Sequence, residues 1–246
     1  MHDTSLFPLS LMVQKLATHA VLSPADCDAL LHLPFSFRTF EPGSYLVREG
    51  DVPDQCGVLA SGYAYRHKTA RNGGRQIVSL HLPGEILDLQ HLYLDVADHS
   101  VQTLTQCHVA TVPRSAFRAL VAERPAIAHA IFVNVLVEGS IFREWLLNIG
   151  QRDARQRVAH LLCEFAVRLD KQGMVPHESY RLPMTQEQLG DALGLTTVHV
   201  NRTLRTLVEE GMITHSRRSI GFASWEALKK ASDFDDHYLH LSQQVA

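Results

Sequence analysis

Apolar residues recur with helical spacing in two neighbouring stretches between Met184 and Gly211. In the first stretch they follow Thr185 at steps of three and four positions, so this threonine can cap a helix that Gly194 then ends. Thr196 can cap a second helix in the same way. The residues expected to form the buried stripe of that helix are Val200, Leu204, Leu207 and Val208. The pattern therefore predicts two short helices joined by a tight turn, of which the second carries a polar and partly cationic face.

A helix-turn-helix places its second helix in the major groove of DNA, with the first residues of that helix at the base edges. Two β-like runs follow here, Met212–Thr214 and Ile220–Ala223, around a turn at His215–Ser219, and they predict a wing. Between Thr196 and Ala223 four arginines outnumber two glutamates, which favours phosphate contacts. A plain pair of antiparallel helices in a globular core is the alternative interpretation. The side chains expected to contact DNA are Thr185, Gln186, Thr196, Thr197, Val198, His199, Asn201, Arg202, Arg205, Arg217 and Arg218.

Short β-like runs separated by turn residues fill the region from Phe35 to Val112. The expected strands are Ser36–Phe40, Tyr45–Arg48, Gly57–Ala60, Tyr63–Lys68, Gln76–His81, Ser100–Leu104 and Val109–Val112. This spacing is typical of a small jelly-roll barrel, and helical spacing between Ser5 and Leu33 predicts helices that cover it. The irregular segment Pro83–His99 interrupts the strands and is either the ligand-binding mouth of the barrel or a plain connecting loop.

A long helix is expected to begin at Pro125 and to run to about Ile149, after a short helix at Arg114–Ala122. Six of its residues alternate steps of four and three, as the seam of a coiled coil does. These residues are Ile131, Val135, Glu138, Phe142, Trp145 and Ile149. We expect a parallel homodimer through this seam; burial of the helix inside one subunit is the alternative.

Gly150–Asp153 is the expected hinge after this helix, and Asp153 can cap a further helix at Ala154–Leu169. A loop at Lys171–Ser179 and a strand at Tyr180–Leu182 then precede the helix-turn-helix, and a last helix is expected at Trp225–Ala231. The predicted fold class is α+β, with four parts in chain order. They are an N-terminal jelly-roll β-barrel at 1–124, a dimerisation helix at 125–150, a winged helix-turn-helix at 151–230 and a C-terminal tail at 231–246.

Composition excludes several classes of protein. The 246 residues are 46% hydrophobic and 20% charged with a net charge of −3, so affinity for DNA must come from a local patch. The first ten residues lack the basic and apolar regions of a signal peptide, and no uninterrupted apolar run approaches the roughly 20 residues of a membrane span. We therefore expect a cytoplasmic protein with no membrane partner. The sequence contains no catalytic motif, CxxC pair or HExxH pair, so we expect neither an enzyme nor a metal site.

Several segments resemble the CRP/FNR family, which comprises the cyclic AMP receptor protein and the FNR regulators. They are GDALGLTTVHVNRTLRTLVEEGMI in the DNA-binding region, and GSYLVREGD, LPGEIL and VPRSAF in the barrel; the likeness covers about residues 5 to 230. The resemblance implies a cyclic-nucleotide-binding-like barrel and a homodimeric transcription factor on a two-fold symmetric DNA site, with RNA polymerase as a further candidate partner. Arg202 matches the arginine that contacts bases in the family, whereas Val198 stands where many members have a glutamate.

The resemblance also implies an effector pocket, formed by Gly84, Glu85, Ile86, Leu87, Asp88, Gln90, His91, His99 and Ser100. Asp88-Leu89 replaces the Gly-Glu pair of cyclic AMP binders, and His99-Ser100 replaces their Arg-Ser, so we do not expect a cyclic nucleotide. The N-terminal cysteine cluster of the FNR oxygen sensors is absent, and His91 lies one position from a haem-ligating histidine of a rarer branch. The cofactor stays unknown: a polar ligand, a metal, a pH response or no ligand are all open. The alternative function is a haem- or small-ligand-binding sensor that signals through the dimer helix to a protein partner.

Overall fold

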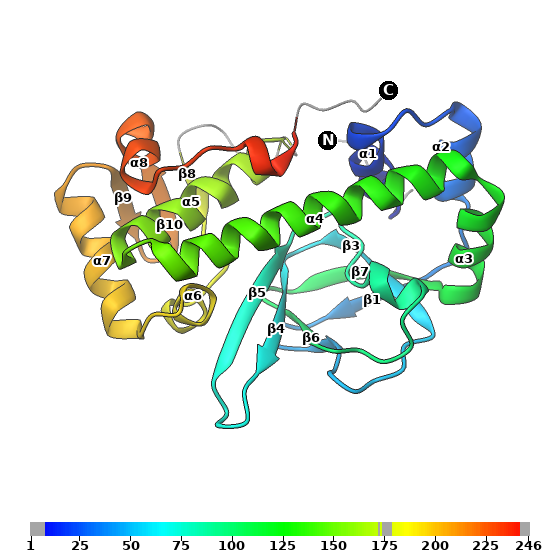
Figure 1. Ribbon diagram of the computed structural model, residues 1–246, viewed down its shortest axis with the longest axis horizontal. Helices are drawn as coiled ribbons and strands as arrows, with labels where there is room; N and C mark the ends of the chain where they lie inside the picture. Colours follow the sequence, from blue (N-terminus) through cyan, green and yellow to red (C-terminus); the bar gives the residue numbers. More distant parts are fainter. Residues whose placement is uncertain (1–7, 172, 174–178, 242–246) are drawn as a thin grey trace. The chain divides into compact units, whose positions relative to one another are not determined.

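The computed structural model describes residues 8–171, 173 and 179–241, and these fall into two compact units (Figure 1). The first unit comprises the chain up to Lys68 together with Ser79–Gly139, and the second comprises Thr69–Val78 together with Ser140–Leu241. Helix α4 (Pro125–Gln151) contributes its first part to one unit and its last part to the other. Most of the expected loop at Lys171–Ser179 lies outside the described residues.

Two short helices, α1 (Ser10–His19) and α2 (Pro24–Leu31), open the first unit. α2 begins where the sequence predicts, because Ser23 and Asp26 form a capping box. The N–H of Asp26 donates to Ser23 Oγ over 3.2 Å, and the N–H of Ser23 donates back to the Asp26 carboxylate over 3.1 Å. The apolar faces of both helices join a buried cluster that includes Leu9, Met12, Leu16 and Leu30.

Seven antiparallel strands among the described residues form two sheets, which belong to this unit apart from residues 69 and 75–78. They are β1 (Ser36–Phe40), β2 (Tyr45–Val47), β3 (Gln55–Ser61), β4 (Ala64–Thr69), β5 (Arg75–His81), β6 (Ser100–Thr103) and β7 (Cys107–Pro113). One sheet has the order β1-β7-β3 and the other the order β2-β6-β4-β5. Side chains of both sheets meet in a core that contains Leu59, Val101 and Val109, as in a sandwich of two packed sheets. Each strand lies within two residues of its expected bounds, and the predicted barrel is confirmed.

The segment between β5 and β6 contains a single 3₁₀ turn, η1 (Leu89–Leu92), and α3 (Arg114–Glu123) follows β7 directly. α4 begins at Pro125, a residue suited to the first turn of a helix because its missing N–H would have no partner there. The break between α4 and the next helix, α5 (Ala154–Lys171), falls in the expected hinge. Asp153 caps α5, since its Oδ1 accepts the N–H of Gln156 over 2.9 Å.

The second unit is built on α5, which packs against α6, α7 and α8. Its elements are β8 (Ser179–Arg181), α6 (Gln186–Leu193), α7 (Thr197–Glu209), β9 (Ile213–Ser216), β10 (Ser219–Phe222), α8 (Trp225–Ser232) and the 3₁₀ turn η2 (His237–Leu239). The three strands pair in the order β8-β10-β9. The described part of the tail, up to Leu241, is anchored because Phe234 and Leu239 are buried.

A buried carboxylate ties α4, α5 and the tail together in the second unit. Glu164 is 1% exposed, and it accepts hydrogen bonds from Trp145 Nε1 over 3.0 Å, from Arg168 Nη1 over 3.1 Å and from the Tyr238 hydroxyl over 2.8 Å. Burial, followed by the negative charge of Glu164, raises the pKa of Tyr238, so this tyrosine stays protonated as a donor.

α4 is the one helix among the described residues that is long and apolar enough to cross a membrane by length and composition; its most apolar 18-residue window has a mean hydropathy of 1.5. Only 28% of that window is buried. Asn134 and Asn148 on the same helix are nonetheless buried and donate to Glu138 Oε1 and to the carbonyl of Arg157. Buried polar groups paired within the protein indicate a helix that packs on its own chain along those faces.

Candidate nucleic-acid interface and ligand pocket

Two threonine caps fix the starts of the paired helices α6 and α7. Thr185 Oγ1 accepts the N–H of Gln188 over 3.2 Å, and Gln188 Oε1 accepts the N–H of Thr185 over 2.8 Å, which completes a capping box. Thr196 Oγ1 accepts the N–H of His199 at the start of α7 over 3.3 Å. Between the helices Gly194 has a φ of +64°, a left-handed conformation that glycine adopts without strain. Both helix starts and the stop between them are as the sequence predicts.

The close approach of α6 to the turn after it depends on a second glycine, which the sequence reasoning did not single out. A Cβ atom on Gly190 would lie 2.5 Å from the carbonyl oxygen of Leu195. The carbonyl of Gly190 in turn accepts the N–H of Leu195 over 3.0 Å. Any larger residue would therefore push the turn away from α6, and α7 begins two residues after that turn.

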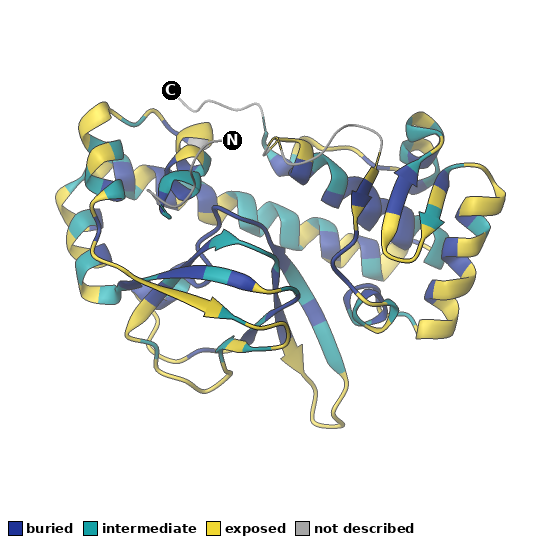
Figure 2. Ribbon diagram, turned by 180° about the vertical axis from the view of Figure 1, so that it is seen from behind, coloured by how far each residue is buried: buried dark blue, intermediate teal, exposed yellow. Residues whose placement is uncertain are grey.

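Buried and exposed residues alternate along α7 (Figure 2). Val200, Leu204 and Leu207 are buried as expected, but Val208 is 39% exposed and Thr203 takes its place in the buried stripe. This prediction was wrong because a helix completes a turn in 3.6 residues, so a position next to a buried leucine can lie just outside the packed face. The expected DNA-facing residues of this helix are all exposed: Thr197, Val198, His199, Asn201, Arg202 and Arg205.

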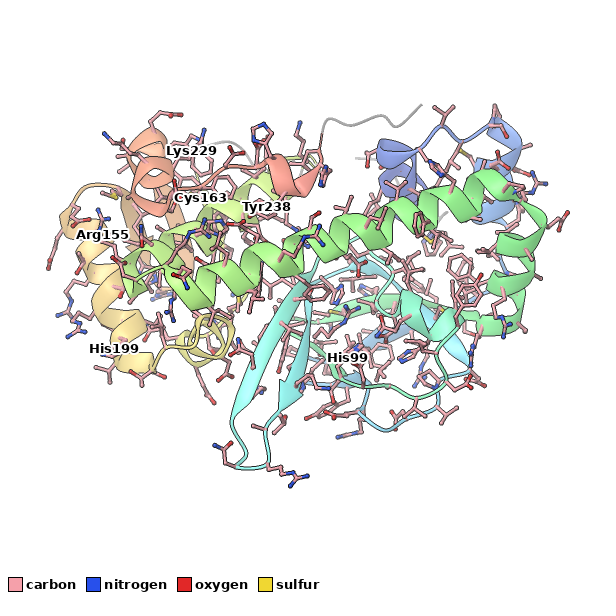
Figure 3. All side chains as sticks on the ribbon, viewed as in Figure 1. His99, Arg155, Cys163, His199, Lys229 and Tyr238 are labelled. Atoms are coloured by element: carbon pink, nitrogen blue, oxygen red, sulfur yellow. The ribbon has the colours of Figure 1, made fainter. Side chains whose placement is uncertain are left out.

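The outer surface of α7 contacts the first residue of α6. His199 lies near the start of α7 (Figure 3), and Asn201 Nδ2 donates to Gln186 Oε1 of α6 over 3.2 Å. Val198 is 75% exposed, so its side chain is accessible on the outer face of α7. Among the described residues, no carboxylate lies within ion-pair distance of Arg202 or Arg205.

The wing is a tight hairpin between β9 and β10. Ser216 pairs with Ser219, so Arg217 and Arg218 alone form the turn, which is shorter than the expected turn at His215–Ser219. Arg217 has a φ of +54°, a conformation that is uncommon outside glycine but suited to a two-residue hairpin turn. Both arginines are exposed, so the structure places two cations at the tip of the wing.

The expected dimer seam of α4 is only partly exposed. Ile131 is 7% exposed and Trp145 6% exposed within the chain, and Glu138 turns inward, where its carboxylate lies 3.8 Å from Arg66 Nη1. Phe142 and Ile149 are half-buried, and Val135 is 45% exposed. The most exposed apolar residues on the helix are Phe132, Val135, Leu136, Leu146 and Leu147. The free apolar face is thus rotated from the one chosen from sequence, because the barrel and α5 occupy the other positions.

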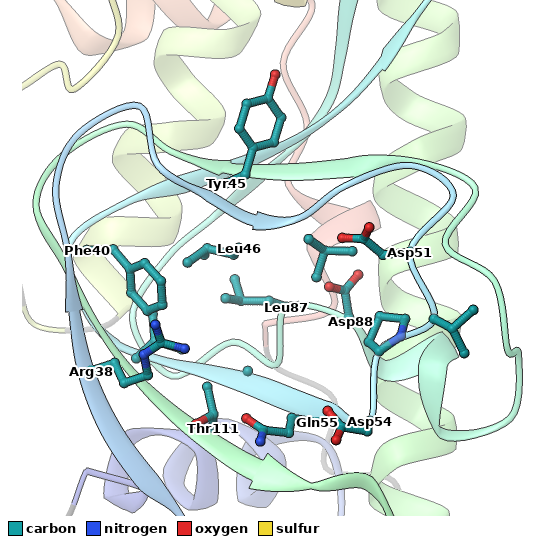
Figure 4. Close-up of a pocket in the computed structure, with 15 residues that line it drawn as sticks. Arg38, Phe40, Tyr45, Leu46, Asp51, Asp54, Gln55, Leu87, Asp88 and Thr111 are labelled. Carbon is teal, nitrogen blue, oxygen red and sulfur yellow. The ribbon is translucent and has the colours of Figure 1, made fainter.

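A pocket of about 450 Å³ opens into the β-barrel of the first unit (Figure 4). Of the residues expected to form an effector site, only Leu87 and Asp88 line it. Its other walls come from β1, β2, β3, β7 and the loop after β2, which contribute residues such as Arg38, Tyr45 and Asp51. Sequence reasoning missed these residues because strand pairing brings them together from distant parts of the chain.

Most of the remaining expected effector residues are buried, and Glu85 forms polar contacts with two side chains. Glu85 accepts from Lys15 Nζ over 2.5 Å and contacts His81 Nδ1 at 3.2 Å. His91 is 0% exposed, and neither of its ring nitrogens has a hydrogen-bond partner among the described residues. Burial is the main cause that lowers the pKa of His91. A haem iron would need access to a ring nitrogen, and His91 does not line the pocket, so the structure gives the haem alternative no support.

His99 bridges two carboxylates at the edge of this cluster. Its Nε2 lies 3.0 Å from Asp88 Oδ1, and its Nδ1 lies 2.7 Å from Asp98 Oδ1. The hydrogen bond from His99 lowers the pKa of Asp98. Burial, together with the charge of Asp88, raises the pKa of the nearby Cys56 thiol to about 12, so this cysteine stays protonated. No cluster of three or more histidine, cysteine or acidic side chains that could hold a metal ion is found in the described part of the chain.

Known proteins are similar to this chain over most of its length. The family model of the Crp-like helix-turn-helix domain matches residues 156–231, and that of the cyclic nucleotide-binding domain matches residues 37–124. The transcriptional activatory protein AadR of Rhodopseudomonas palustris is 30% identical over 203 residues, which are 82% of each chain. The activator FnrL of Cereibacter sphaeroides is 28% identical over 77% of this chain and 78% of its own. The structure of FixK2 from Bradyrhizobium japonicum superposes with a TM-score of 0.75 at 23% identity, and the match covers 81% of this chain and 98% of FixK2.

Proposed function

Because this chain belongs to the CRP/FNR family of transcription regulators, we propose that it binds a two-fold symmetric DNA site as a homodimer through α7 and the wing. One observation carries the proposal: the outer face of α7 is exposed along its length and carries Arg202 and Arg205, which have no carboxylate partner among the described residues. Cations that no protein carboxylate neutralises are available to phosphates and base edges. The wing adds two more at Arg217 and Arg218.

The residues divide into two roles by their place on the motif. Thr185, Thr196 and the two wing arginines lie at helix starts and at a hairpin tip, where contacts to phosphates fix orientation without reading sequence. The side chains proposed to face the bases are Thr197, Val198, His199, Asn201 and Arg202. Arg202 can donate in a bidentate manner to guanine, and the exposed Val198 can contact a thymine methyl group.

Dimer formation is proposed to bury the free apolar face of α4. Phe132, Val135, Phe142 and Leu146 follow one another at steps of three, seven and four residues, which is the heptad spacing of a coiled coil interrupted once, at Gly139. Phe132 and Leu146 are 60% and 73% exposed, which is costly for large apolar side chains in water. Pairing two copies of α4 removes these side chains from water and presents α7 twice, as a symmetric operator requires.

We assign one role to each part of the chain that the sequence predicts. Residues 1–124 form the sensor, 125–150 the dimerisation helix, 151–230 the DNA-binding part and 231–246 the tail. Such a regulator acts in the cytoplasm, on DNA and with RNA polymerase as a candidate partner, and has no catalytic role. The division agrees with the two family models, which match the barrel and the DNA-binding part separately.

Selection of bound duplexes from a pool of random DNA tests the proposal. The full-length protein is expected to enrich an inverted repeat, and Arg202→Ala is expected to lose the enriched motif while it still binds DNA weakly. Arg118→Ala serves as the matched control, because Arg118 is exposed on α3 in the first unit and its guanidinium lies over the ring of Tyr93. Enrichment of the same motif by Arg202→Ala, or of a motif without two-fold symmetry, would refute the assignment.

A further inference from the structure

The pocket of the first unit has a mainly polar lining with a strongly acidic side and a smaller apolar part. Its volume of about 450 Å³ falls within the range of about 300 to 1,000 Å³ that is usual for small-molecule sites. Leu46, Val47, Leu87 and Val109 supply apolar surface in its interior. Figure 4 shows Asp51 and Asp88 side by side at one side, and Arg38 with Phe40 at the opposite side.

Asp88 is the residue whose bonding is incomplete. Its side chain is 1% exposed and lines the pocket, and Oδ1 is engaged by His99 Nε2 at 3.0 Å. Oδ2 is buried and accepts no hydrogen bond from any described residue. A buried carboxylate oxygen without a donor is costly, because water no longer solvates it and no protein group replaces the water.

The other charged side chains that line the pocket also favour a cation there. Asp51 and Asp54 add two carboxylates to the lining, whereas Arg38 is the one lysine or arginine there. The guanidinium of Arg38 lies over the ring of Phe40, 5.1 Å from its centre, on the side away from Asp88. An anion at Asp88 would meet repulsion, and an ammonium group there would form a charge-assisted hydrogen bond with Oδ2.

We propose that this pocket binds a small organic amine, with its ammonium group on Asp88 Oδ2 and its apolar body against Leu46, Leu87 and Val109. Two features of the lining suit such a ligand: a carboxylate oxygen that lacks a donor, and a small apolar part to which Leu46 and Val47 contribute. A cyclic nucleotide carries a negatively charged phosphate, so its charge is opposite to that of the proposed ammonium group.

A direct chain of contacts connects this site to α4. Leu87 precedes Asp88, and its carbonyl oxygen accepts a hydrogen bond from Arg66 Nη2 over 2.9 Å. Arg66 Nη1 lies 3.8 Å from Glu138 on α4, and all four residues belong to the first unit. A ligand that moves Leu87 therefore changes the environment of α4. The role of the amine as an effector rests on the proposed function, whereas its binding is measured without DNA, so the two claims fail separately.

A matched series of ligands separates charge from shape. Phenethylamine, 2-phenylethanol and 3-phenylpropionate share one skeleton and differ in the terminal group, and hexylamine, hexanol and hexanoate form an aliphatic set. Thermal unfolding and isothermal titration of the full chain at neutral pH are expected to show saturable binding and a raised Tm with an amine, and none with the alcohol or carboxylate of the same skeleton. Failure of both amines to bind, or equal binding of the alcohols, would overturn the proposal.

Two variants locate the bound ammonium group. Asp88→Asn keeps the size of the side chain and removes its charge, so amine affinity is expected to fall roughly tenfold or more. Asp28→Asn removes a carboxylate of α2 that does not line the pocket, and it is expected to leave amine affinity unchanged. Circular dichroism checks that both variants fold. Amine binding that persists in Asp88→Asn at the original affinity would place the ligand elsewhere and refute the site.

Discussion

Truncation of Leu146 on α4 should separate the proposed dimer. Leu146 is 73% exposed in the single chain, and full burial of a leucine contributes about 1.5 to 3 kcal/mol. Burial of the exposed part in a dimer is therefore worth roughly 1 to 2 kcal/mol per subunit. Both subunits of a symmetric dimer carry the substitution, so the loss of dimerisation free energy is doubled. Leu146→Ala is expected to weaken dimerisation by about 2 to 4 kcal/mol, which raises the dimer Kd roughly 30- to 700-fold.

Sedimentation over a range of protein concentrations measures this shift directly. Val21→Ala is the control, because Val21 is also 73% exposed but lies between α1 and α2, away from α4. Leu146→Ala should dissociate at concentrations where the parent chain and Val21→Ala remain dimeric. A dimer Kd that is unchanged by Leu146→Ala, or raised equally by Val21→Ala, would show that the free face of α4 is not the interface.

Three further predictions concern stability and the helix-turn-helix. Gly190→Ala should destabilise the second unit by about 1 to 3 kcal/mol, because its Cβ would meet the carbonyl of Leu195, and chemical denaturation measures the loss. Glu164→Ala should cost about 1 to 3 kcal/mol in the same assay, because it removes the buried acceptor that Trp145, Arg168 and Tyr238 share. His91 has a pKa below its usual 6.5, so the unfolded chain binds more protons and the free energy of unfolding falls as the pH drops below 6.5; His91→Leu should reduce that pH dependence.

Each of these predictions has a result that would contradict it. A Gly190→Ala variant as stable as the parent would mean that the α6 turn has room for a methyl group. If Glu164→Ala unfolds at the parent's denaturant concentration, its hydrogen bonds contribute little to the second unit. An unaltered slope of stability against pH in His91→Leu would assign the acid sensitivity to other groups, of which the buried His81 has its pKa lowered by burial in the same way.

Local chemistry explains why so much of the fold could be predicted from the sequence. Ser23, Thr185 and Thr196 accept hydrogen bonds from backbone N–H groups three residues further along the chain. A few neighbouring residues therefore determine where each of these helices begins. Strand positions followed from turn residues between apolar runs in the same way. The exposed face of α7 could be predicted because one apolar stripe was clear, and only Val208 at its edge was misplaced.

Features that depend on contacts between distant residues could not be predicted in this way. α4 carries more than one apolar face, and which face stays free is decided by what packs against Ile131 and Trp145. The pocket combines Arg38, Asp51 and Asp88, which lie up to 50 positions apart in the sequence and are brought together by strand pairing. Up to Leu241 the tail lacks a periodic pattern because two single residues, Phe234 and Leu239, are buried rather than one repeating face.

The central claim is that α7 reads DNA sequence, and the affinity of Arg202→Ala for its selected site and for unrelated duplex, measured over a range of salt concentrations, tests it most directly. The account predicts that Arg202→Ala reduces the preference for the selected site roughly 5- to 150-fold, the equivalent of about 1 to 3 kcal/mol, and retains weak, salt-sensitive binding. Arg217→Ala should instead weaken binding to both duplexes alike. A variant without Arg202 that keeps the full preference of the parent chain would contradict the account.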